Sequence, residues 1–153
     1  VRISLYLNYR WRVAHHKVDR ATKMKRCNRL GSKVNMQIMR RLAERSVKEK
    51  REYGVAICKN GSNTELQSLR KGNRNGVYWS PCKNGKRIGS FHTHLDHVPL
   101  PSDADKATFL RRHDKIACIS GKIGKSRNIV CYTNKFYKDG VMTLQLTPPA
   151  CVF

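Results

Sequence analysis

The strongest constraint on the fold is a switch of hydrophobic period near residue 52. Residues 35–51 carry apolar side chains at helical spacing with arginines between them, and residues 53–58 form a short continuous apolar run. The first pattern predicts an amphipathic helix with Asn35 as its N-cap, and the second predicts a buried strand that ends in a turn.

The rest of the chain continues this alternation of short strands and helices. Residues 61–87 are polar and glycine-rich, with a possible strand at 77–79. Strand-like runs at residues 88–94, 116–120, 128–133 and 141–146 flank a helix predicted from Ser102 to about Arg112, which follows a loop containing Pro99 and Pro101. A chain of 153 residues suits one domain, so we predict an α/β fold in which a mixed β-sheet is flanked by helices.

Charge is distributed unevenly along the chain. The sequence has 32 Lys and Arg against 10 Asp and Glu, a formal net charge of +22. Residues 1–51 hold 16 of these cations and 3 of the acids. We therefore divide the chain into a basic N-terminal extension, residues 1–34, and a domain, residues 35–153. The extension is expected to attract nucleic acid or another acidic partner.

The opening residues and the cysteine spacing bear on the cellular compartment and on the redox state of the cysteines. The opening residues have no continuous apolar stretch typical of a signal peptide or a membrane span, so a soluble, cytoplasmic protein without membrane contact is expected. The six cysteines are widely spaced and contain no Cys-x-x-Cys pair. We favour free, buried cysteines over a disulfide framework, although the intracellular proteins of hyperthermophiles are a known exception.

The residues that carry chemistry lie between positions 92 and 105. His92-Thr93-His94 is followed by seven residues and then Ser102-Asp103-Ala104-Asp105. Residues two apart on a strand project from the same face, so His92 and His94 can present two imidazoles side by side. Asp105, in the first turn of the next helix, would supply a third ligand and leave a fourth position for water, which is the arrangement of a catalytic zinc site.

A hydrolase needs an acid/base group and oxyanion stabilisation beside its metal. Zinc lowers the pKa of a bound water to roughly 7, but a general base must still take the proton and pass it to the leaving amine. Glu52, at the junction of the predicted helix and strand, is the candidate base. Ser102 is the candidate hydrogen-bond donor to the developing oxyanion.

The order of these residues resembles the JAMM motif of the MPN domain, a family that includes deubiquitinase-like metalloproteases and bacterial RadC-like proteins. The resemblance covers about residues 35–135. It implies that His92, His94 and Asp105 bind one zinc ion, that Glu52 is the acid/base, and that Ser102 assists the oxyanion. Gly54 and Pro101 also match the motif, whereas Leu95 stands where many members have proline.

Other interpretations of the same residues stay open. Ser102-x-x-Asp105 is also an ordinary helix capping box, and a His-x-His pair often has no ligand role. Pro81-Cys82 resembles half of a nucleobase deaminase signature, but position 85 is glycine and no His-x-Glu accompanies it. An MPN-like scaffold that keeps the motif without turnover is a further possibility.

The residues themselves predict metal-assisted hydrolysis. The resemblance implies a zinc-dependent metalloprotease or isopeptidase that acts on a ubiquitin-like protein or another extended peptide. The alternative is a nucleic-acid-binding protein that uses its basic surface and keeps the domain as a scaffold.

Overall fold

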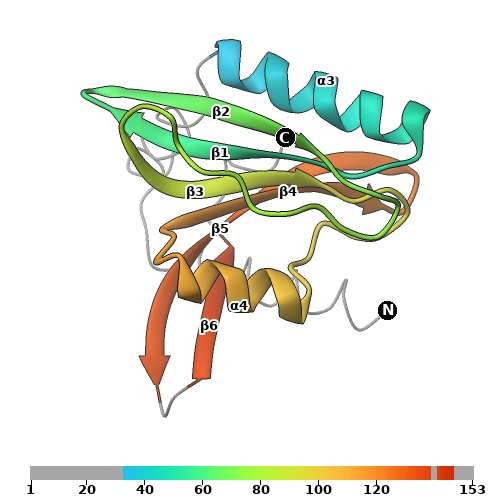
Figure 1. Ribbon diagram of the computed structural model, residues 1–153. Coiled ribbons are helices and arrows are strands. Elements are labelled where there is room, and N and C mark those ends of the chain that lie inside the picture. Colours follow the sequence, from blue (N-terminus) through green and yellow to red (C-terminus); the bar gives the residue numbers. More distant parts are fainter. Residues whose placement is uncertain (1–32, 139–140, 147–153) are drawn as a thin grey trace.

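A mixed six-stranded sheet in the order β2-β1-β3-β4-β5-β6 forms the centre of the computed structural model, which describes residues 33–138 and 141–146 (Figure 1). The elements are α3 (Lys33–Glu49), β1 (Tyr53–Asn60), β2 (Asn63–Lys71), β3 (Lys86–Thr93), α4 (Asp103–Arg111), β4 (Ile116–Ile123), β5 (Ser126–Lys138) and β6 (Val141–Leu146). Only β3 and β4 are parallel, and α4 lies in the crossover between them. The predicted α/β class, a mixed sheet flanked by helices, is confirmed. Residues 1–32 of the expected extension lie outside the described residues.

The helices α3 and α4, within the described residues, cover opposite faces of the sheet. Met36, Met39 and Leu42 of α3 pack against Tyr53, Val55 and Phe91 on one face. On the other face Phe109 of α4 packs against Ile119, Val130 and Tyr132. Neither helix, in the part of the chain that the structure describes, is long and apolar enough to cross a membrane.

Two local predictions were wrong. Asn35 is not an N-cap, because α3 already begins at Lys33. The buried side-chain amide of Asn35 instead donates from its Nδ2 to the Thr64 carbonyl (2.8 Å). The possible strand at 77–79 is part of an irregular segment, residues 72–85, which we call the strap. Strand β2, which precedes the strap, was missed because it lies at the sheet edge, where its half-buried, mostly polar residues give no hydrophobic pattern.

The expectation of free cysteines was also wrong for the described residues. Cys58 of β1 is bonded to Cys82 of the strap, and Cys118 is bonded to Cys131 directly opposite it on β5. Three of the four are buried, as expected, but pairing depends on which strands become neighbours, and the spacing along the chain does not show that.

Two hydrogen-bonded hydroxyl groups, those of Ser46 and Thr93, join α3 to the start of β1 and the end of β3. The Thr93 hydroxyl accepts from the Tyr53 amide (2.9 Å) and donates to the Ser46 hydroxyl (2.8 Å), which donates to the Arg51 carbonyl (2.6 Å). The residues bound at the two ends, Arg51 and Tyr53, flank Glu52. The network therefore fixes the backbone on both sides of the candidate base.

Replacing Thr93 by the isosteric valine should destabilise the fold. Thr93→Val leaves the buried Tyr53 amide without its acceptor and Ser46 without a donor, so the free energy of unfolding in urea should fall by about 1–3 kcal/mol. Thr64→Val, the same change on the edge strand β2, should stay within about 0.5 kcal/mol of the original protein. Equal effects of the two substitutions would show that the hydroxyl network contributes nothing specific.

Candidate metal centre

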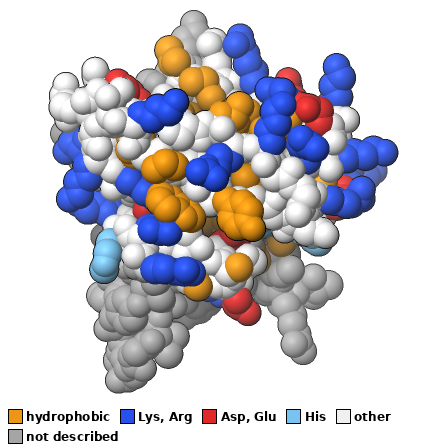
Figure 2. All heavy atoms as spheres, in the orientation of Figure 1, with side chains coloured by type: hydrophobic (Ala, Val, Ile, Leu, Met, Phe, Trp, Pro, Cys, Tyr) orange, Lys and Arg blue, Asp and Glu red, His pale blue; other side chains and the backbone are white. Residues whose placement is uncertain are grey.

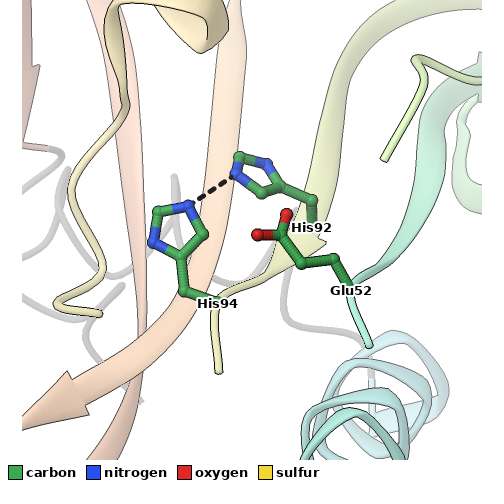
Figure 3. A group of neighbouring side chains, drawn as sticks. All are labelled: Glu52, His92 and His94. Carbon is green, nitrogen blue, oxygen red and sulfur yellow. Dashed lines mark hydrogen bonds between the residues drawn. The ribbon is translucent and has the colours of Figure 1, made fainter. Parts of the chain in front are cut away.

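The two histidines lie at the end of β3, on the face that α4 covers. Phe91 and Thr93 point to the opposite face and are fully buried there. This alternation places His92 and His94 side by side, with their Nε2 atoms 3.1 Å apart (Figure 3). The His94 amide donates to the Ser120 carbonyl of β4 (2.8 Å), so the second histidine is held by the parallel strand pair although it follows the last residue of β3.

Asp105, in the first turn of α4, completes a triangle with the two imidazoles. Its Oδ2 lies 3.2 Å from His92 Nε2 and 3.7 Å from His94 Nε2. The same oxygen accepts from the Ser102 amide (2.9 Å), and the Asp105 amide donates to the Ser102 hydroxyl (3.1 Å). The capping box is therefore real, and it is compatible with a ligand role because it turns the carboxylate towards the histidines.

Glu52 approaches the histidines from the position just before β1, the strand next to β3. Its side chain is buried, with 5% of the residue exposed, and it offers an oxygen within 4.8 Å of the imidazole nitrogens of both histidines (Figure 3). Two backbone hydrogen bonds hold it against the strap: the Glu52 amide donates to the Asn73 carbonyl (2.7 Å), and the Gly72 amide donates to the Glu52 carbonyl (2.7 Å).

The geometry of these donors fits a tetrahedral metal ion such as the predicted zinc. Ligand atoms around an ion with bonds of 2.0–2.1 Å should lie about 3.3–3.4 Å from one another. The three measured separations among His92, His94 and Asp105 are 3.1, 3.2 and 3.7 Å. His94 Nδ1 lies 2.8 Å from the Val98 carbonyl, which can only accept, so in neutral His94 the proton is on Nδ1 and the Nε2 lone pair faces the site.

The electrostatics of the centre also favour a cation. Burial alone would lower the pKa of His94, but hydrogen bonds to Asp105 and to the Val98 carbonyl outweigh it, so the pKa is raised. For Asp105, burial opposes ionisation, yet hydrogen bonds from His92 and His94 hold its pKa well below its usual range. A site that favours positive charge between these groups is suited to a divalent ion.

Glu52 has the opposite shift. Burial raises the pKa of its carboxyl group, and the two histidines only partly offset this effect. A carboxylate with a raised pKa holds a proton more readily, and this is the property that a group needs when it must first accept a proton and then donate it.

Arg127 of β5 is a contributor that sequence reasoning missed. Its guanidinium donates to the carbonyls of His94 (3.1 Å) and Leu95, at the point where the chain leaves β3. Leu95 stands where the motif often has proline, a residue that would restrict the backbone. Here the hydrogen bonds from Arg127 hold the turn instead. No local pattern could have identified it, because it lies more than 30 residues away in the sequence.

An open cleft of about 560 Å³ lies beside these groups. Its walls include Glu52 and His94, together with His97, Ser102 and the strap residue Val77. His97 has its ring centre 6.2 Å from that of His94 and lines the cleft without belonging to the ligand triangle. The volume lies in the range that protein clefts use for ligands.

Comparisons with known proteins give little further information. No protein-family model matches the chain, and no curated protein matches it. Among solved structures, it is similar to a JAB1/MPN domain protein from Archaeoglobus fulgidus, with 20% identity over 62% of this chain and 82% of that chain and a TM-score of 0.42. A likeness of this degree does not assign a family.

Removing the Arg127 side chain should weaken metal binding while leaving all the ligands in place. Groups that orient metal ligands typically contribute 10–100-fold to affinity, so Arg127→Ala should raise the zinc dissociation constant by about ten-fold or more. Competition with a chromophoric chelator measures this constant. Lys125→Ala, in the exposed β4–β5 turn, is the matched control. An unchanged constant in Arg127→Ala would contradict the orienting role.

Proposed function

We propose that this protein is a zinc-dependent peptidase or isopeptidase. The observation that carries the proposal is the convergence of His92, His94 and Asp105 at the ligand separations of a tetrahedral ion, with the buried Glu52 beside them. Three protein ligands leave one position for water, which is typical of catalytic rather than structural zinc sites. The resemblance to the JAMM motif supports the same assignment of roles.

The protein's own groups supply the remaining chemistry. When bound, zinc acidifies water and polarises the carbonyl group of the substrate. Glu52 takes the proton from the attacking water and transfers it to the nitrogen of the leaving amine, and its raised pKa suits both steps. Ser102 lines the cleft, and its hydroxyl oxygen accepts from the Asp105 amide, so its own hydrogen remains available to an oxyanion.

We propose a protein or peptide substrate. The cleft of about 560 Å³ beside the ligand triangle supports this proposal, because its volume lies in the range that protein clefts use for ligands. A ubiquitin-like tail is the substrate that the motif resemblance suggests.

Metal content should test the ligand set directly. The protein supplied with zinc should contain about one ion per chain, and His92→Ala and Asp105→Ala should each lose most of it, because two remaining ligands hold zinc weakly. His97→Ala is the matched control, since His97 lines the cleft outside the triangle and should leave the zinc content unchanged. Elemental analysis with a folding check by circular dichroism makes the measurement. Full zinc in His92→Ala would overturn the ligand set.

Glu52→Gln separates the hydrolase from a non-catalytic scaffold. The substitution keeps shape and burial but removes the basic carboxylate, so zinc content should persist while peptide hydrolysis falls by about 10²-fold or more. Zinc-loaded original protein that hydrolyses no member of a broad peptide library would point to a scaffold, and hydrolysis that persists unchanged in Glu52→Gln would contradict the role of Glu52.

A second proposal, that the protein also binds nucleic acid, rests on its charge. Lys and Arg side chains are spread over the face seen in Figure 2 rather than confined to one patch, and Arg40, Arg41 and Lys48 of α3 are exposed. Affinity for duplex DNA should therefore fall steeply as salt rises, and should be unchanged in His92→Ala. Fluorescence anisotropy measures both, and salt-independent binding would contradict the proposal.

A further inference from the structure

A second, smaller hollow of about 60 Å³ adjoins the ligand triangle, and we call it the side slot. His92 lines the slot, His94 lines the open cleft, and Asp105 lines both. Val77 and Thr108 are also common to the two hollows. The metal ligands therefore stand at the junction between a wide cleft and a small side slot.

The side slot exists because small residues lie beneath it. Gly54, Ser90 and Ala117 line its floor on the sheet. The strap covers Gly54, because a Cβ atom added to this glycine would lie 3.2 Å from the side chain of Val77. Phe109 of α4 and Ile119 of β4 add apolar walls.

Trp79, which is 38% exposed, forms a wall of the slot and is contacted by two arginines. The Arg112 guanidinium lies 3.5 Å from the centre of its ring and the Arg87 guanidinium lies 5.4 Å from it. Arg87 is itself fixed, because both its Nε and Nη2 donate to Asp114 (2.9 Å each) and its Nη1 donates to the Ser80 carbonyl. Cation–π contacts of this kind restrain an aromatic ring at a partly exposed site.

We propose that the side slot receives the substrate side chain next to the bond that is cleaved, and that Trp79 limits this side chain to a short apolar one. The inference rests on the proposed function. A volume of 60 Å³ is about four times what one water molecule needs, which is room for three or four non-hydrogen atoms, as in valine or leucine. Charged side chains are disfavoured because Arg87 and Asp114 already neutralise each other in this buried region.

The test measures binding rather than turnover. Zinc-loaded protein is titrated with a series of hydroxamic acids, which chelate zinc, whose substituent grows from methyl through isobutyl to naphthylmethyl. Affinity should peak at isopropyl or isobutyl and fall by about ten-fold or more for naphthylmethyl, since the closed wall rejects the larger group. Trp79→Ala should bind naphthylmethyl at least as tightly as isobutyl. Leu69→Ala, which removes an exposed apolar side chain of β2 away from both hollows, should keep the original profile.

Each outcome decides the proposal. A flat profile in the original protein, or an unchanged profile in Trp79→Ala, overturns the side slot while leaving the zinc site standing. Arg112→Ala provides a second route if Trp79→Ala does not fold, because it frees the ring and should broaden the profile in the same direction. Zinc content is measured separately, so a protein without zinc refutes the proposed function itself, and the slot with it.

Discussion

The placement of Thr93 between two histidines is the constraint on which the candidate site depends. A strand that exposes two imidazoles on one face must bury the intervening side chain on the other, and threonine brings a hydroxyl into that buried position. The hydroxyl joins two elements, because it accepts from the Tyr53 amide of β1 and donates to Ser46 of α3. The candidate ligands His92 and His94 at the end of β3, and the candidate base Glu52 just before β1, are therefore positioned by hydrogen bonds to the same buried oxygen atom.

Asp105 shows how a structural motif and a chemical one can share an atom. Its carboxylate begins α4 by accepting the Ser102 amide and at the same time lies against both histidines. A capping box fixes the rotamer of the residue at its third position, and that restraint would reduce the entropy lost if the carboxylate bound a metal ion as proposed. The stability of the helix and the order of the centre therefore have a common origin.

The parts of the site that could be predicted from sequence are those set by local periodicity. The alternation of side chains along a strand predicted that His92 and His94 lie together, and the predicted helix start placed Asp105 in a first turn. The structure adds that the start of α4 lies beside the end of β3. The contributions of Arg127, of the Cys58–Cys82 bond and of the edge strand β2 were not predictable, since each depends on contacts between distant segments. Asn35 was predicted as an N-cap because asparagine is a good capping residue. In the structure it lies within α3, and its side chain binds a distant partner, the Thr64 carbonyl.

The strap has a mechanical consequence for the whole centre. The start of the strap is hydrogen-bonded to both the amide and the carbonyl of Glu52. Val77, in its middle, lines both hollows. Near its other end, Cys82 forms a disulfide with Cys58 of β1. Any displacement of the strap that widens the path for an incoming chain also pulls on the residue assigned to proton transfer. Under the proposed function, the position of the strap would therefore set both the width of the cleft and the placement of Glu52.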